Sequence, residues 1–116
     1  MDCIFCKIIK KEIPSFTIYE DDLVVAFLDA NPDSNGHTLV VPKKHFKDIM
    51  DVDPNTLNHI FKVINIIYKR LESKLYFDGL SIVQNNGFVQ EVKHLHFHLK
   101  PAYKSGNNAV LSDVQD

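Results

Sequence analysis

Histidine alternates with apolar residues over positions 94–99, which read His94-Leu95-His96-Phe97-His98-Leu99. Successive side chains of a β-strand point to opposite faces of a sheet, so this alternation predicts a strand that buries its apolar set. The three histidines would then share the other face at intervals of about 6.6 Å. Three imidazoles in perfect alternation are an unusual sheet surface, and a merely solvated polar face is therefore the weaker interpretation.

The segments on either side predict an α+β domain with a mostly antiparallel five-stranded sheet. Strands are expected at residues 16–20, 23–28, 37–41, 80–84 and 92–100. A long helix is expected from Asp53, a good N-cap residue followed by Pro54, to Lys74. A short helix is expected over residues 3–11. The domain is expected at residues 1–101 and a short polar tail at 102–116.

The composition of this 116-residue chain is that of one globular domain, with 45% hydrophobic residues, 24% charged residues and a formal net charge of −2. At this net charge we do not expect the protein to bind nucleic acid through general electrostatic attraction. Apolar runs are far shorter than the roughly 20 residues of a membrane span, and no secretory signal is recognised. We therefore expect a cytoplasmic protein that binds neither membrane nor nucleic acid.

Two chemistries would use three imidazoles on one sheet face. Imidazole has a pKa near 6.5, so it is partly uncharged at neutral pH and can attack phosphorus to form a covalent phosphohistidine. Two histidines separated by one strand residue can instead bind zinc. The only two cysteines, Cys3 and Cys6, are compatible with redox activity, metal binding or simple burial.

The alternating histidines resemble the signature of the histidine triad family, and other segments resemble its Hint-like branch in the same order over residues 3–101. These segments are Cys3-Ile4-Phe5-Cys6-Lys7-Ile8-Ile9, Glu12-Ile13-Pro14, Tyr19-Glu20-Asp21-Asp22, Ala26-Phe27-Leu28-Asp29, residues 36–45, Asn85-Asn86-Gly87 and Gln90-Glu91-Val92. The resemblance implies a homodimeric enzyme that acts on purine nucleotides such as AMP phosphoramidates at the α-phosphorus.

The resemblance also assigns roles to the histidines. His96 matches the nucleophile, which forms a nucleotidyl-histidine intermediate that water then hydrolyses. His98 matches the third histidine, which contacts the phosphate and handles the leaving-group proton. His94 matches the first and supports the geometry, and His37 matches a supporting histidine behind the triad. His59 has no motif around it and is expected to be an incidental surface residue.

Other matched positions concern nucleotide binding. Asp29 resembles the acid that binds the ribose hydroxyls, although a turn-forming role before Pro32 is the plain alternative. Asn85 and Gln90 match positions at the phosphate site. Phe5, Ile8 and Phe27 match the apolar base pocket, together with Ile4, although apolar residues on a helix and a strand are usually core.

A structural zinc ion is also implied by the resemblance. Many bacterial members bind zinc through four positions that correspond here to Cys3, Cys6, His45 and His94. Four protein ligands saturate tetrahedral zinc, which makes such a site structural rather than catalytic. His96 and His98 would then remain for the chemistry.

The sequence departs from the family pattern near the phosphate site. Only Phe88 and Val89 separate Gly87 from Gln90, about two residues fewer than is usual in the family. Many relatives carry Ser where this chain has Glu91, and a carboxylate there would repel a nearby phosphate unless it turns away. The short tail lacks Trp, so the family's substrate preference does not transfer.

Three functions therefore compete at the level of sequence. The first is a phosphoramidase-like nucleotide hydrolase or transferase that uses His96, with a dinucleoside polyphosphate hydrolase as the variant of the same class. The second is a zinc-dependent hydrolase with an open metal site. The third is a nucleotide-binding scaffold with little catalysis.

Overall fold

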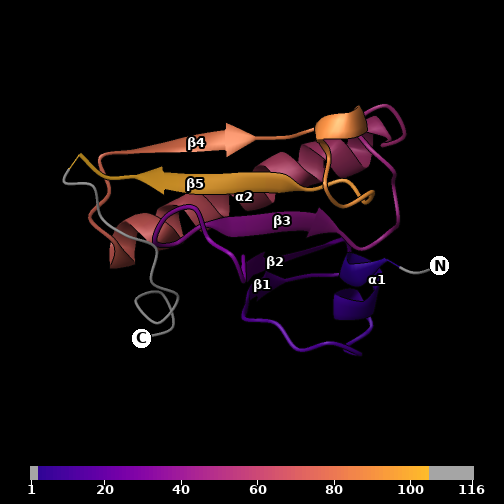
Figure 1. The fold of residues 1–116 in the computed structure, drawn as a ribbon, viewed down its shortest axis with the longest axis horizontal. Coiled ribbons are helices and arrows are strands. Elements are labelled where there is room, and N and C mark those ends of the chain that lie inside the picture. The colour runs from indigo at the N-terminus through magenta and orange to yellow at the C-terminus, as the bar shows by residue number, and fades with distance from the viewer. Residues whose placement is uncertain (1–2, 105–116) are drawn as a thin grey trace.

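The structure, a computed structural model, describes residues 3–104 of the chain. Its elements follow in the order α1 (Ile4–Ile9), β1 (Thr17–Glu20), β2 (Val24–Leu28), β3 (Thr38–Pro42), α2 (Pro54–Lys74), β4 (Gly79–Val83), the 3-10 turn η1 (Gly87–Val89) and β5 (Phe97–Ala102). The strands form one antiparallel sheet in the order β1-β2-β3-β5-β4 (Figure 1). The predicted α+β class, sheet and helices are confirmed.

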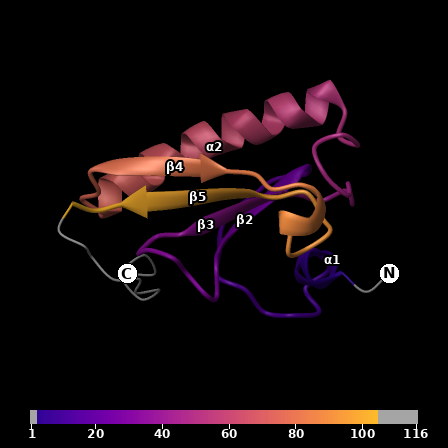
Figure 2. The same ribbon diagram turned by 45° about the horizontal axis from the view of Figure 1, so that its top comes forward.

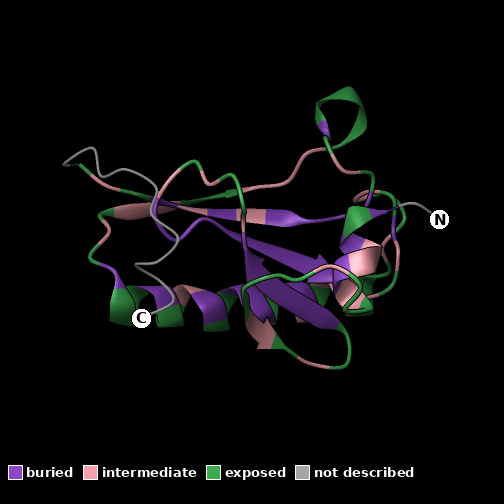
Figure 3. Ribbon diagram, turned by 60° about the horizontal axis from the view of Figure 1, so that its bottom comes forward, coloured by how far each residue is buried: buried purple, intermediate pink, exposed green. Residues whose placement is uncertain are grey.

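Helix α2 lies across one face of the sheet (Figure 2). The Asp53 carboxylate caps it by accepting a 3.0 Å hydrogen bond from the backbone N–H of Thr56, and Pro54 occupies its first turn. One side of the helix is buried against β2, β3 and β5 in the main core, through Ile60, Val63, Ile64, Ile67 and Leu71. Figure 3 shows the central strands in the buried colour and the outer side of α2 exposed.

The opposite face of the sheet is partly covered by the short helix α1. Cys3 caps this helix, because its Sγ accepts from the backbone N–H of Cys6 at 3.3 Å. Phe5 and Ile8 turn inward and form a second apolar cluster with residues of β2 and β3, namely Val25, Phe27, Leu39 and Val41. Each sheet face therefore has its own core, and the smaller one borders the histidines.

The last strand starts later than the alternation predicts. β5 covers Phe97–Ala102 rather than residues 92–100, and its pairing with β3 reaches only from Val40 opposite Phe97 to Thr38 opposite Leu99. The backbone N–H of Leu95 instead donates to the carbonyl of Phe46 at 2.7 Å, so the chain before Phe97 is held by a loop. The three histidines therefore do not lie on one regular strand.

The other end of β5 continues through Pro101 to Ala102, one residue into the expected tail. Proline is tolerated because β3 no longer pairs with β5 at this position, so the missing N–H costs no ladder bond. Residues 105–116, which make up most of the expected tail, lie outside the described residues. Among the described residues, no helix is long and apolar enough to cross a membrane.

Candidate active site and metal centre

A cavity of about 860 Å³ opens on the face of the sheet that carries α1. Its walls include most of the residues predicted to act on a nucleotide: Ile4, Phe5, Ile8, Phe27, Asp29, His37, Asn85, His96 and His98. The apolar members come from α1 and β2, and the histidines come from β5 and the segments that flank β3 and β5. The fold thus brings an apolar pocket next to a row of imidazoles.

His96 is held in one tautomer by the backbone. Its Nδ1 lies 2.7 Å from the carbonyl oxygen of His94, which can only accept, so Nδ1 carries the proton and Nε2 keeps its lone pair. The ring is 5% exposed and meets the ring of Phe5 edge-to-face at 5.0 Å. Burial lowers the pKa of His96, against the opposing effects of the His94 carbonyl and of the Asp29 and Glu91 charges. A neutral imidazole with a free Nε2 is a competent nucleophile.

His98 is oriented by a relay that passes through His37. The backbone N–H of Asp33 donates to Nδ1 of His37 at 3.0 Å, so the proton of neutral His37 must be on Nε2. That Nε2–H donates to Nδ1 of His98 at 2.9 Å. The neutral ring of His98 consequently carries its proton on Nε2, where it can donate to a ligand in the cavity.

Burial keeps both rings of this relay neutral. It is the main cause that lowers the pKa of His98 to about 4, and the neighbouring His96, His37 and Lys100 lower it further while Asp29 raises it. Burial also lowers the pKa of His37, which Asp29 partly offsets. At neutral pH the histidines of the cavity are therefore hydrogen-bonding groups rather than cations.

Asp29 lies at the end of β2, at the edge of the cavity. Its Oδ1 accepts from the backbone N–H of Asn31 at 2.9 Å, and its Oδ2 lies 3.6 Å from Nε2 of His37. The Asp29 side chain is 21% exposed, so a ligand can still reach the carboxylate. The Asp29 carboxylate therefore stabilises the turn and also remains accessible to a ligand, so the two roles that the sequence left as alternatives do not exclude each other.

Gln90 does not line the cavity. It is buried, and its Nε2 donates to the carbonyl of Lys47 at 2.7 Å, which ties the turn after η1 to the loop that precedes α2.

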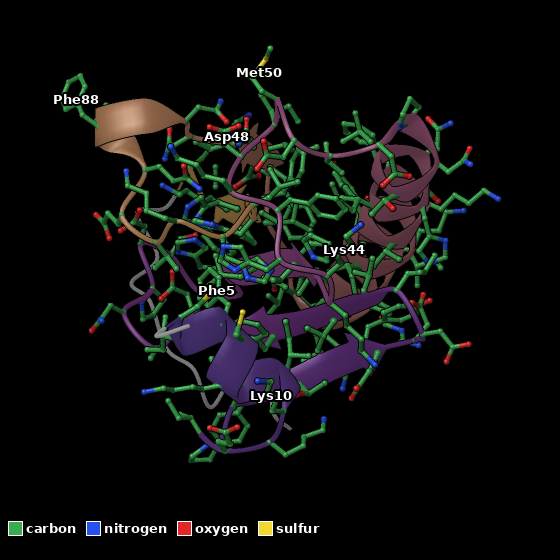
Figure 4. All side chains as sticks on the ribbon, turned by 90° about the vertical axis from the view of Figure 1, so that its right-hand side faces the viewer. Phe5, Lys10, Lys44, Asp48, Met50 and Phe88 are labelled. Carbon is green, nitrogen blue, oxygen red and sulfur yellow. The ribbon has the colours of Figure 1, made fainter. Side chains whose placement is uncertain are left out.

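Phe88 is almost fully exposed and projects from the body of the molecule, as does Met50 (Figure 4). Glu91, by contrast, lines the cavity, so its carboxylate lies beside the histidines and raises the pKa of His96.

Cys3, Cys6, His45 and His94 come together beside α1, as the metal hypothesis requires. Their ligand atoms all lie within 4.8 Å of one another. His94 Nδ1 is 3.4 Å from Cys3 Sγ, and Cys6 Sγ is 3.3 Å from His45 Nδ1. Tetrahedral zinc, with its usual bond lengths, places sulfur and nitrogen ligands about 3.6 Å apart, close to these separations.

The tautomer of His94 agrees with a ligand role. Its Nε2 lies 2.8 Å from the carbonyl oxygen of Pro42, so Nε2 carries the proton and Nδ1 presents a lone pair to the two sulfurs. Such a bond from the second ring nitrogen to a carbonyl is typical of metal-binding histidines. The donor set, two thiols and two imidazoles, is one that zinc prefers. The residues present therefore fit a zinc ion.

A second group of possible ligands, Asp29, His37 and His98, does not fit a metal in the same way. His37 Nδ1 accepts from the Asp33 N–H, so its Nε2 must keep a proton and has no lone pair to offer. The same tautomer that orients His98 thus excludes His37 as a ligand.

Lys100 is a cavity residue that the sequence analysis missed. It continues the alternation of His96 and His98 by one more step along β5 and lines the same cavity. Its Nζ lies 2.8 Å from Oδ2 of Asp33. The period-two spacing from His98 was the signal that could have identified it.

Comparisons with known proteins agree with this geometry. The profile of one family, described as HIT domain, matches residues 10–105. An uncharacterised HIT-like protein of Methanocaldococcus jannaschii is 49% identical over 110 residues, which are 93% of this chain and 84% of the relative. An adenosine 5′-monophosphoramidase of Saccharomyces cerevisiae is 44% identical over 85% of this chain and 61% of its own length. An adenylylsulfatase of Arabidopsis thaliana is 34% identical over 86% of this chain and 52% of its own length.

Solved structures of similar proteins share the fold. A zinc-bound histidine triad family protein from Mycobacterium smegmatis superposes with a TM-score of 0.85 at 36% identity, over 91% of this chain and 78% of that protein.

Proposed function

Because this chain belongs to the HIT domain family, we propose that it is a nucleotide hydrolase or transferase that acts at the α-phosphorus of purine nucleoside phosphoramidates and related nucleotidyl conjugates. The observation that carries the proposal is the fixed tautomer of His96, whose Nε2 is free in a cavity that also holds His98 and Asp29. The named yeast and plant relatives, a phosphoramidase and an adenylylsulfatase, support the same reaction class.

In the proposed mechanism, His96 Nε2 attacks the α-phosphorus and the bond from phosphorus to the leaving group breaks. An amine leaving group takes up one proton from the solvent as it departs, while His98 Nε2–H donates a hydrogen bond to it and keeps its proton, and a nucleotidyl-histidine remains. Water then attacks the phosphorus, the P–N bond to His96 breaks, and the nucleoside monophosphate is released. One water is consumed for each conjugate cleaved, and both histidines return to their starting tautomers.

The nucleotide is proposed to lie across the sheet from α1 to β5. Phe5, Ile8 and Phe27 would hold the base, and Asp29 would accept from the ribose hydroxyls, since it lines the same cavity two residues after Phe27 and its Oδ2 lies 3.6 Å from Nε2 of His37. Asn85 would contact the phosphate. Gln90 would act indirectly, through the loop that it holds, because its amide is already bonded to Lys47.

We propose a structural role for zinc at Cys3, Cys6, His45 and His94. Four ligands from the protein leave no open coordination position, so the bound ion would supply bracing and no Lewis-acid chemistry. His94 would link the brace to the active site, because its carbonyl oxygen fixes the tautomer of His96. Each step of the proposed reaction is performed by groups outside the metal ligands.

We propose a homodimer formed at the β4 edge of the sheet. β4 is the edge strand next to β5 and carries Ile82, which is 48% exposed. Phe61 on α2 is also 48% exposed and contacts Phe97 of β5. An edge strand with exposed apolar side chains is a ready surface for pairing with a second copy.

The test of the proposed reaction is replacement of the nucleophile. His96→Ala should abolish turnover of adenosine 5′-phosphoramidate while AMP still binds in calorimetry, because base and ribose contacts remain. His59→Ala, which changes a histidine of α2 outside the cavity, is the control and should retain activity. Undiminished turnover by His96→Ala would overturn the covalent mechanism. If the unaltered protein bound AMP but turned over no substrate, the result would instead favour a nucleotide-binding scaffold.

A further inference from the structure

Lys100 extends the functional face of β5 beyond the histidines. Along this strand Phe97, Leu99 and Pro101 are buried in the core, whereas His98 and Lys100 alternate with them on the cavity side. Residues two apart on one strand face are separated by about 6.6 Å. A ligand group bound at His98 is therefore within reach of the flexible Lys100 side chain.

The charge of the cavity makes this lysine important. Among the residues that line the cavity in the described part of the chain, Lys100 is the only Lys or Arg, whereas Asp29, Asp33 and Glu91 are all carboxylic acids. Burial lowers the pKa of His37 and of His98, which are thus neutral at pH 7. A substrate with several negative charges meets three carboxylates and a single fixed cation.

The present partner of Lys100 can be exchanged. Asp33 pairs with it at 2.8 Å, but the Asp33 side chain is 63% exposed and the Lys100 side chain 29% exposed. Ion pairs at such exposure contribute little free energy, because water solvates both charges well. A substrate phosphate or sulfate brought to the cavity by the nucleotide's other contacts can replace the Asp33 carboxylate at little cost.

We propose that Lys100 is a specificity-determining residue that favours nucleotide conjugates with an anionic leaving group, a phosphate or a sulfate, by exchanging Asp33 for that group. This inference rests on the proposed function and specifies its substrate class. The step is the one described above with a different leaving group: the bond from the α-phosphorus to the bridging oxygen breaks, and sulfate or phosphate departs with the bonding electrons. Sulfate needs no proton to leave, so only its charge has to be stabilised.

The experiment compares Lys100→Met with Asp33→Asn, because both remove the same ion pair but only the first removes the cation. Initial rates are measured for adenosine 5′-phosphosulfate and for adenosine 5′-phosphoramidate. We expect Lys100→Met to lower kcat/KM for the phosphosulfate about tenfold and to change it less than twofold for the phosphoramidate. Asp33→Asn should keep or increase the preference for the phosphosulfate, and Lys100→Arg should preserve it.

Two results would overturn the proposal. Equal losses on both substrates would mean that Lys100 serves the α-phosphate or the fold rather than the leaving group. Equal behaviour of Lys100→Met and Asp33→Asn would mean that the ion pair merely holds the loop that carries Asp33.

Binding measurements keep this inference separate from the proposed reaction. If the unaltered protein hydrolysed neither substrate, the proposed reaction would be wrong. The affinity for ADP relative to AMP would still test the role of Lys100. Lys100→Met should then weaken ADP about tenfold and AMP little, and equal weakening of both would overturn the role of Lys100. An effect seen with ADP but not with the phosphosulfate would identify a phosphate, and the reverse a sulfate, as the group that Lys100 favours.

Discussion

Nε2 of His37 lies 2.9 Å from Nδ1 of His98, although the two residues are 61 positions apart in the chain. The backbone N–H of Asp33 fixes the proton of His37 on the nitrogen that faces His98. A main-chain bond in a turn thus determines which nitrogen of His98 can donate to a substrate. The same turn carries the carboxylate that pairs with Lys100.

The first prediction concerns this relay. His37→Phe keeps a ring behind the cavity but removes the donor to His98, so the tautomer of His98 is no longer fixed. We expect kcat for the phosphoramidate to fall at least tenfold, since an oriented hydrogen-bond donor to the reacting group is lost, with little change in AMP affinity. ¹⁵N NMR of the imidazoles should show the Nε2–H tautomer of His98 in the unaltered protein and a mixture in the variant. An unchanged tautomer in the variant would contradict the relay.

The same spectra test the protonation of His98. Its pKa is lowered to about 4, first by burial and then by the neighbouring imidazoles and Lys100. The ring should therefore stay neutral as the pH falls through 6.5 and gain its second proton only near pH 4. A titration midpoint near 6.5 would show that the ring is not desolvated as the structure has it.

The second prediction concerns zinc. Cys6→Ser should lower the bound metal to well below one ion per chain, measured by elemental analysis, because a thiolate ligand is lost. Removal of the ligand should also lower the Tm, since a metal whose free concentration is 1,000 times its dissociation constant stabilises the folded state by about 4 kcal/mol. Turnover measured below the lowered Tm should persist, because the reaction uses His96 and His98. Immediate loss of activity in folded, metal-free protein would instead favour the zinc-dependent hydrolase.

The histidine alternation and the Asp53-Pro54 helix start were readable from the sequence because both are local patterns. The start of β5 was not, because residues 92–96 have a strand-like pattern but the backbone N–H of Leu95 donates to the carbonyl of Phe46, a distant residue in the chain. The pairing of His59 with Asp21 was missed for the same reason. These residues are 38 positions apart, and no motif marks either as a partner.

The third prediction concerns that pair. The Asp21 carboxylate lies 2.6 Å from both Nε2 of His59 and the hydroxyl of Tyr19, and it accepts two backbone N–H groups of the β1–β2 turn. Burial raises its pKa, but these hydrogen bonds outweigh that effect and lower the pKa to about 2. Because the folded pKa is below the unfolded one, the stabilisation is complete above about pH 4 and is lost as the pH falls toward 2.

Asp21→Asn should therefore reduce the free energy of unfolding by about 1–2 kcal/mol at pH 7 and by much less near pH 2. Urea denaturation at several pH values measures this difference. His59→Gln serves as the matched variant and should show part of the same loss. A constant difference across the pH range would mean that the carboxylate charge is not what stabilises the turn.

The fourth prediction concerns the dimer. Ile82→Glu places a charge on the exposed side of the edge strand, where a second copy would have to bury it. The variant should elute as a monomer in size-exclusion chromatography with light scattering, whereas the unaltered chain should elute as a dimer. Phe16→Glu, at a residue that is 52% exposed and precedes the opposite edge strand β1, is the control and should remain dimeric. A monomeric unaltered chain would contradict the proposed assembly.

The last prediction concerns Gly36, which closes the turn that positions His37. Its φ is +90°, and a Cβ there would lie 2.5 Å from Cδ1 of Leu75 and 3.2 Å from Cγ of Pro101. Gly36→Ala should therefore destabilise the protein through both backbone strain and overlap, by about 2–4 kcal/mol. Gly87→Ala separates the two effects, because Gly87 has a φ of +70° but nothing within 4 Å of its Cβ position, and it should lose only about 1 kcal/mol. Thermal denaturation of both variants measures the difference, and equal losses would show that the contact with Leu75 is relieved by a small movement of its side chain.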